Sequence, residues 1–419
     1  MTITGARMAW LFSVAIGILM AGPARSVSPD IPSLPAHNST ECGTSQLGCT
    51  WERTLGGKVE DKIYGITELT NGDYAIAGYT RSTDGLDYDG WLVRLDRSGQ
   101  VIWQHRFGGY ENDQLYGLAA MPDGGLVAAG FTRSRSAGES DVWVIRVSGE
   151  GSLVWEANFG GVENDRARSI QVTSDGNILV AGTNASKGLG NQDAWILLLD
   201  SKGKLIWDRS FGGPGSDGVL STAALTDGSV AFAGYREAPN GFDYWVVKLD
   251  AQGQLKWNRP FLFGGFSAAT AITAAPDGGI YVAGLAQLAL THPPEAVLLR
   301  LDARGAQRWR LDLGGKSRHP GKGDEAWSIA TNKNGGCIVA IATASRGAGS
   351  TDARLVSISE SGDVSWERLF GRTQWDRPST VAFSADGGML VGGHTTSMGA
   401  GYEDGWVLRL DKDGRIGSK

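Results

Sequence analysis

The segment WEANFGGVENDRARSIQVTSDGNILVAGTNASKGLGNQDAWILLLDSKGKLI, which runs from Trp155 to Ile206, contains the whole pattern of this chain in one copy. It holds four runs of strand length, at 168–173, 177–183, 194–200 and 204–211, the last continuing past Ile206. Ser-Asp-Gly follows the first run, a loop rich in Gly, Ser and Asn follows the second, and Asp-Ser-Lys-Gly follows the third. Short apolar runs joined by hairpin turns predict four antiparallel strands, which we call A, B, C and D in chain order.

The same unit occurs seven times along the chain. Its strand D tryptophan recurs every 50 to 57 residues, at Trp51, Trp103, Trp155, Trp207, Trp257, Trp309 and Trp366. Four antiparallel strands in a unit of this length are typical of a propeller blade. Because strand D at Trp51 precedes every strand A, we expect it to complete the last blade and close the ring. The sequence therefore predicts an all-β seven-bladed β-propeller over residues 49–416, with four-stranded antiparallel blades.

The N-terminal segment reads as an export signal. Residues 1–24 combine Arg7, an apolar run at 8–20 and the small residues Gly22 and Ala24, as expected of a cleavable signal peptide. The run is shorter than the roughly 20 residues that a membrane-spanning helix needs. We expect a linker at 25–48, a short tail at 417–419, and a secreted or periplasmic monomer with no membrane span in the mature form.

Cysteine usage and charge exclude several classes of protein. Cys42 and Cys49 flank a six-residue loop and are expected to form a disulfide in an oxidising compartment, whereas Cys337 reads as a buried apolar residue. Neither a metal-ligand spacing nor a Gly-rich phosphate loop occurs, so we expect neither a metal site nor a cofactor. A formal charge of −6 argues against nucleic acid as a partner.

Three phrases carry a resemblance to a known group of proteins. W-x-x-x-F-G-G, D-G-G-x-x-x-A-G-x-T and D-x-W-x-x-x-L-D-x-x-G-x-x-x-W resemble the repeats of secreted bacterial β-propellers, which are broadly related to the quinoprotein-type propellers. The resemblance covers about 49–416 and implies the fold. It does not imply an activity, since propellers of this kind include dehydrogenases, lyases, lectins and assembly scaffolds. The vicinal cysteines of quinoprotein alcohol dehydrogenases are absent from the sequence.

Residues that recur in every unit are expected to build the scaffold. This holds for the strand D tryptophans and for a second row in strand C, namely Trp91, Trp143, Trp195, Trp245 and Trp406. Acidic residues before strand A are expected to cap turns rather than bind a cation; they are Asp61, Asp113, Asp165, Asp217, Asp324 and Asp376. The Gly-Gly pairs before strand A are expected to turn the chain with positive φ.

Departures from the repeat point to the functional residues. They concentrate in blades five to seven, where Val297 and Arg354 replace the strand C tryptophan and where Trp327 and Trp375 lie outside the repeated positions. Together with Arg318, His319, Asp376, Arg377 and His394 these two tryptophans form a candidate ligand patch on the rim of the B–C loops and the D–A crossings. The alternative, which we favour because a large aromatic residue in a β protein is usually in the core, is that Trp327 and Trp375 fill the space that the missing tryptophans leave.

A second group of candidates follows the acidic residues into strand A. Blade geometry directs these side chains to the mouth of the central channel; they are Lys62, Tyr64, Gln114, Tyr116, Arg166, Arg168 and Arg377. Tyrosines mixed with cationic groups suit an anionic or glycan ligand.

Two classes of function remain open. The first is an exported, non-catalytic binding or assembly propeller that recognises an extracellular or periplasmic protein or polysaccharide through the loop rim of blades five to seven. The second is an extracellular carbohydrate-active enzyme, a lyase or hydrolase, with its site at the channel mouth. We favour binding over catalysis because no G-x-S-x-G elbow, H-E-x-x-H pair or comparable motif is present.

Overall fold

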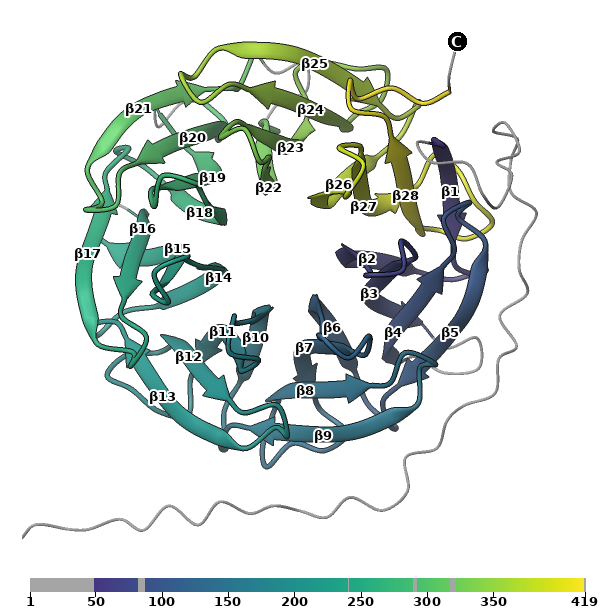
Figure 1. The fold of residues 1–419 in the computed structure, drawn as a ribbon. Helices are drawn as coiled ribbons and strands as arrows, with labels where there is room; N and C mark the ends of the chain where they lie inside the picture. The colour runs from purple at the N-terminus through teal and green to yellow at the C-terminus, as the bar shows by residue number, and fades with distance from the viewer. Residues whose placement is uncertain (1–48, 82–86, 240, 289–291, 317–321, 418–419) are drawn as a thin grey trace, which may run out of the picture.

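The computed structural model describes residues 49–81, 87–239, 241–288, 292–316 and 322–417. Their regular structure consists of strands, which form seven four-stranded antiparallel sheets arranged in a ring around a central axis (Figure 1). We call the region around this axis the central channel. The predicted seven-bladed propeller is therefore confirmed.

Each blade runs outward from the channel. Blades one to three consist of β2 (Asp61–Glu68), β3 (Tyr74–Arg81), β4 (Tyr88–Leu95), β5 (Val101–Phe107); β6 (Asp113–Ala120), β7 (Leu126–Thr132), β8 (Asp141–Val147), β9 (Leu153–Phe159); and β10 (Asp165–Val172), β11 (Ile178–Asn184), β12 (Asp193–Leu199), β13 (Leu205–Phe211). Blades four and five consist of β14 (Asp217–Ala224), β15 (Val230–Ala238), β16 (Gly241–Leu249), β17 (Leu255–Phe261); and β18 (Ser267–Ala274), β19 (Ile280–Ala286), β20 (Glu295–Leu301), β21 (Gln307–Asp312). Blades six and seven consist of β22 (Glu325–Thr331), β23 (Cys337–Thr343), β24 (Asp352–Ile358), β25 (Val364–Phe370); and β26 (Asp376–Phe383), β27 (Met389–Thr395), β28 (Asp404–Leu410), β1 (Trp51–Leu55).

The first and the last of the described strands build blade seven together. Strand β1 pairs antiparallel with β28, with Trp51 opposite Arg409 and Leu55 opposite Gly405. This pairing gives β28 a partner on its outer side, so blade seven is as complete as the others (Figure 1). The expected closure by the N-terminal strand is confirmed.

The two rows of tryptophan tie the blades together. The strand C tryptophans are at most 2% exposed. Each indole N–H donates a hydrogen bond to a side chain on strand D of the same blade, at the position directly after the strand D tryptophan. These acceptors are Gln104, Glu156, Asp208, Asn258 and Glu52. Strand D tryptophans reach the neighbouring blade instead. Trp103, for example, donates to the carbonyl of Gly149 in the strand C–D turn of blade two. The expected structural role of both rows is confirmed.

The space left by the missing tryptophan of blade five is filled from blade four. Tyr244 of β16 is fully buried, packs in one cluster with Val297, and donates its hydroxyl to the carbonyl of Val282 at 3.0 Å. Trp327 and Trp375 are 37% and 45% exposed. The alternative that these two residues fill the gaps is therefore wrong, because an aromatic ring that fills an interior space does not keep that much contact with solvent.

Most of the Gly-Gly pairs do not turn with positive φ, contrary to expectation. Among the predicted pairs only Gly56 and Gly264 do so, at 135° and 89°. Gly108 shows the other reason for glycine here: a Cβ atom would collide with the carboxylates of Asp89 and Asp113. The glycine is required because two acidic side chains approach the backbone closely.

Candidate functional site

The B–C loops and the D–A crossings lie on one rim. Four bridges outside the named strands join a B–C loop residue to the crossing that leads to the next blade; they are Glu403 with Glu60, Ser140 with Asn164, Gln192 with Ser216, and Thr351 with Trp375. Loops on a rigid scaffold are where binding residues are usually found, so this rim is the first place to look for a site.

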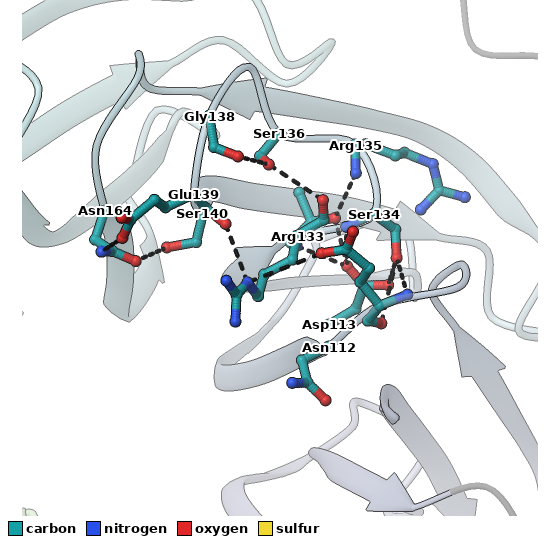
Figure 2. A network of polar contacts seen from close by, with 12 residues as sticks. Asn112, Asp113, Arg133, Ser134, Arg135, Ser136, Gly138, Glu139, Ser140 and Asn164 are labelled. Carbon is teal, nitrogen blue, oxygen red and sulfur yellow. Dashed lines mark hydrogen bonds and ion pairs between the residues drawn. The ribbon is translucent and has the colours of Figure 1, made fainter. Parts of the chain in front are cut away.

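Buried aspartates hold the rim in place. The Asp113 carboxylate accepts hydrogen bonds from the backbone N–H of Gly109 at 2.8 Å and from the Ser134 hydroxyl at 2.6 Å, and it also accepts from Thr132. Figure 2 shows this network, in which Ser140 of the same B–C loop donates to Asn164 of the next crossing at 2.7 Å. The expected capping role of these aspartates is confirmed. Among the residues that the structure describes, no three His, Cys, Asp or Glu side chains gather in a way that could hold a metal ion.

Every innermost strand contains a β-bulge at the same position. In β2 the pairing with β3 passes from Ile63 directly to Gly65, so Tyr64 has no partner, and the other six innermost strands repeat this irregularity. The bulged residues in blade order are Tyr64, Tyr116, Arg168, Leu220, Thr270, Trp327 and Ser379. We call these seven positions the bulge ring. A bulge redirects a side chain, and bulges are common beside functional sites.

The bulge ring brings together four of the site residues expected from the sequence. Tyr64, Tyr116, Arg168 and Trp327 occupy equivalent positions on strands that line the channel (Figure 1). Trp327 therefore belongs to a repeated slot, which the sequence pattern did not reveal. Each bulged residue lies three positions after the capping position of its blade, as Tyr64 follows Asp61 and Trp327 follows Asp324. This spacing identifies the slot once the bulge itself is known.

An aromatic cluster covers the channel wall in blades seven, one and two. The Tyr64 ring stacks on Tyr79 with 5.7 Å between centroids and meets the Tyr116 ring edge-on at 5.0 Å. His394 lies 6.5 Å from Tyr64 on the other side. Burial raises the pKa of the Tyr64 phenol, which therefore stays neutral in the cluster.

His394 is part of the wall rather than of an accessible patch. It is 8% exposed, and its Nε2 lies 3.3 Å from Glu403. Burial, assisted by the charges of Lys62 and Arg377, lowers the pKa of His394 to about 3. Lys62 in turn bridges Glu60 and Glu403 at 2.8 and 3.0 Å, so its charge is already compensated.

Cationic groups cover the tryptophans of blades six and seven. The Arg377 guanidinium lies 5.4 Å from the centre of the Trp327 ring and forms an ion pair with Glu325 at 2.7 Å. The Lys322 ammonium lies 4.4 Å from the centre of the Trp375 ring. Arg318 and His319 lie outside the described residues, so their place in the expected patch stays a prediction. Asp376, the remaining member, is a buried cap.

The cysteines divide as follows. Cys337 is 1% exposed, and burial raises the pKa of its thiol to about 12, which agrees with a buried apolar role and not with a nucleophile. Cys42 lies outside the described residues, so the expected bond to Cys49 stays a prediction. Within the described part of the chain we find no helix long and apolar enough to cross a membrane.

Comparisons with known proteins support the fold and leave the function open. No family model matches the chain. A curated relative, the regulatory protein FlaEY of Caulobacter vibrioides, is 23% identical over 225 residues, which make up 45% of this chain and 23% of that protein. The matched region thus spans less than a quarter of that relative's length.

Solved structures of similar shape include puromycin hydrolase, with a TM-score of 0.52 and 14% identity over 80% of this chain and 50% of that one. Sqt1 of Chaetomium thermophilum bound to the N-terminus of ribosomal protein L10 has a TM-score of 0.49 and 15% identity over 85% of this chain and 98% of that one. PorZ, a surface component of the type-IX secretion system of Porphyromonas gingivalis, has a TM-score of 0.48 and 12% identity over 85% and 47%. At such identities the likeness concerns the fold alone, and the chain is similar in architecture to proteins of very different function.

Proposed function

We propose that this chain is an exported, non-catalytic binding propeller that holds an extracellular or periplasmic protein or glycan at the channel mouth, on the rim of the B–C loops and D–A crossings. Export rests on the signal-like segment at 1–24. The observation that carries the binding role is the bulge ring. Positions that build the scaffold, such as the capping aspartates, are nearly identical from blade to blade, whereas the bulge ring holds Tyr, Tyr, Arg, Leu, Thr, Trp and Ser.

A ring of this kind is well suited to recognition. Each bulge leaves its residue outside the regular ladder of strand pairing, and the chain repeats this in all seven blades. The backbone that carries these side chains is a rigid scaffold, which reduces the entropy lost when a partner binds. The site includes Trp327 and Arg377 from the sector expected from the sequence, and it extends through blade seven into blades one, two and three.

The test is a binding screen of the mature chain, residues 25–419, on a glycan array and by partner capture from a secreted protein fraction. Tyr116→Ala and Trp327→Ala are the channel-mouth variants. Ile206→Ala is the matched control, because Ile206 is a 50% exposed apolar residue on the outer strand β13, beside the C–D turn and away from the B–C loops and D–A crossings. We expect each channel-mouth variant to weaken binding at least tenfold with a melting temperature close to that of the wild type, and the control to bind normally.

Binding that is lost only in Ile206→Ala would place the site on the outer face of the blades and contradict the proposal. Cleavage of a bound glycan by the wild-type chain would instead support the carbohydrate-active enzyme.

A further inference from the structure

A pocket of about 380 Å³ opens between blades three and four, beside the bulge ring. Its volume lies in the range of roughly 300–1,000 Å³ that small-molecule sites have. Its lining side chains include Asn164, Arg166, Arg168, Thr183, Gln192 and Tyr235. Leu220 is the only aliphatic residue in that lining.

Blade four makes room for the Tyr235 side chain. Gly218 occupies the position that Lys62, Gln114 and Arg166 occupy in the three preceding blades. A Cβ atom at Gly218 would lie 2.7 Å from the Tyr235 hydroxyl and 2.7 Å from the Thr183 methyl group. The absence of a side chain here therefore leaves space for Tyr235 beside the channel.

The two arginines of the pocket have no acidic partner. Lys62 and Arg377, which face the same channel, are neutralised by Glu60, Glu403 and Glu325. Arg166 and Arg168 form no ion pair with any described residue, in a protein whose formal charge is −6. Burial lowers the pKa of Arg166, and the charge of Arg168 lowers it further, whereas Glu139, which accepts a hydrogen bond from Asn164, acts in the opposite direction. Two neighbouring cations that form no ion pair favour an anion in that place.

Aromatic rings hold both guanidinium groups in position. Arg166 lies 4.5 Å from the centre of the Phe131 ring, and Arg168 lies 4.3 Å from the centre of the Tyr116 ring. A guanidinium that stacks by its face keeps the N–H groups along its edge for in-plane hydrogen bonds, the geometry that a carboxylate accepts. Arg166 uses two of these N–H groups within the protein: Nη2 donates to Asn164 at 3.2 Å and Nε donates to the Ser140 hydroxyl at 3.4 Å, while Nη1 makes no hydrogen bond with a described residue.

Neutral polar groups complete the pocket. The Tyr235 hydroxyl donates to Gln192 Oε1 at 3.1 Å, which orients the amide. The amide nitrogen of Gln192 makes no hydrogen bond with a described residue. Amide and hydroxyl groups can bind sugar hydroxyls, which are both donors and acceptors.

We propose that this pocket binds a uronic acid residue of an acidic glycan. Arg166 and Arg168 hold the carboxylate, while Gln192 and Tyr235 bind the ring hydroxyls. The inference rests on the proposed binding function and names its ligand class. An acidic peptide would satisfy the arginines equally well, but it would present methylene groups to the amide and hydroxyl side chains; the polar lining therefore favours the sugar.

The experiment uses four monosaccharides as probes and measures their affinity for the mature chain by titration calorimetry. Glucuronic and galacturonic acid are compared with glucose and galactose. We expect at least one uronic acid to bind ten times more tightly than its neutral counterpart, and we expect that binding to weaken as salt rises from 0.05 to 0.5 M.

Arginine variants assign the binding to the pocket. Arg168→Gln is expected to reduce uronic acid affinity at least tenfold, and Arg168→Lys is expected to give an intermediate value, because it keeps the charge and loses the planar fork. Arg304→Gln is the matched control, since Arg304 is exposed in the turn between β20 and β21, at the end of the blade away from the B–C loops. Melting temperatures of all variants confirm that they are folded.

Three results would overturn the inference. They are equal affinity for charged and neutral sugars, uronic acid binding that Arg168→Gln leaves unchanged, and a hexaglutamate peptide that binds more tightly than any uronic acid through the same arginines. If Tyr116→Ala and Trp327→Ala still lose partner binding in the glycan array or the capture experiment while Arg168→Gln binds normally, the binding function stands and only the ligand class fails. If no channel-mouth variant affects any partner, the proposed function itself fails.

Discussion

His394 shows how one residue can change the chemistry of a repeated slot. It lies opposite Arg377 in the pairing of β26 with β27, and the equivalent residues of blades one and two are Tyr79 and Phe131. The imidazole therefore occupies a place that those blades give to an aromatic ring. Because it is buried beside the cationic Lys62 and Arg377, its neutral form is favoured.

We predict that His394 makes the protein sensitive to acid. Its pKa is lowered from 6.5 to about 3, so the stability it contributes is fully present above pH 6.5 and is lost as the pH falls toward 3. Over that interval the loss amounts to at most about 5 kcal/mol. Chemical denaturation of wild type and His394→Phe at pH 7, 5 and 4 measures it, and the variant should lose distinctly less stability.

His105→Gln, on the outer strand β5, is the matched control for removal of a histidine side chain. Parallel stability curves for wild type and His394→Phe between pH 7 and 4 would show that another group causes the acid response.

At the scale of the elements, neighbouring blades match large residues with small ones. The strand C tryptophan of one blade packs against strand C of the preceding blade. Its partner there is the residue directly before that blade's own strand C tryptophan. A Cβ atom at Gly90 of blade one would lie 2.9 Å from the ring of Trp143 in blade two. In blade four the preceding residue is Tyr244, and blade five has Val297 in place of tryptophan. Here the aromatic side chain reaches from blade four into blade five, the reverse of the direction at the other interfaces, and the interface stays filled.

This complementarity predicts a strong coupling between positions 244 and 297. Tyr244→Ala should cost about 3–5 kcal/mol by opening a cavity, and Val297→Trp should cost about 1–3 kcal/mol by overpacking. The double variant restores the pair found between blades three and four, Ala194 and Trp245. We therefore expect it to be more stable than Tyr244→Ala alone. Urea unfolding of the wild type, the two single variants and the double variant gives the coupling energy. If the stability losses of the single variants simply add in the double variant, positions 244 and 297 do not complement each other.

A structural element can be predicted from the sequence when the residues that determine it lie close together in the chain. Turn residues and apolar runs recur with each unit, so the blades and their strand order follow from the sequence alone. The bulge ring does not, because a bulge is a mismatch in register between two strands, and neither strand contains it alone. The compensation by Tyr244 was missed for the same reason, since it lies 53 residues from Val297. Tyr64, Tyr116 and Arg168 were found because they follow an acidic residue that marks the start of the strand.

At the scale of the whole molecule, the ring is closed by pairing the first strand of the propeller, β1, with β28, the last strand in chain order. Trp51 is fully buried, and the backbone N–H of Gly417 donates to the Thr50 hydroxyl at 2.5 Å, so the last described residues lie beside the first. Strand β1 covers the edge of β28, whose backbone groups would otherwise be free to pair with another chain. The closure therefore protects the molecule as a whole and not only blade seven.

The meeting of the ends predicts a circular permutant that folds. In blade three the strand D tryptophan, Trp207, lies seven positions after Asp200, which begins the turn that follows strand C. Joining Ile416 directly to Thr50 places Trp51 seven positions after Asp411, so residues 58–416 followed by 50–57 form blade seven from one continuous segment.

We expect this permutant to be monomeric with a melting temperature within a few degrees of the wild type. Residues 58–416 alone should aggregate or melt far lower, because β28 has an open edge. Size-exclusion chromatography and thermal melting compare the three chains, and a truncated chain as stable as the wild type would mean that β1 is not needed to close the ring.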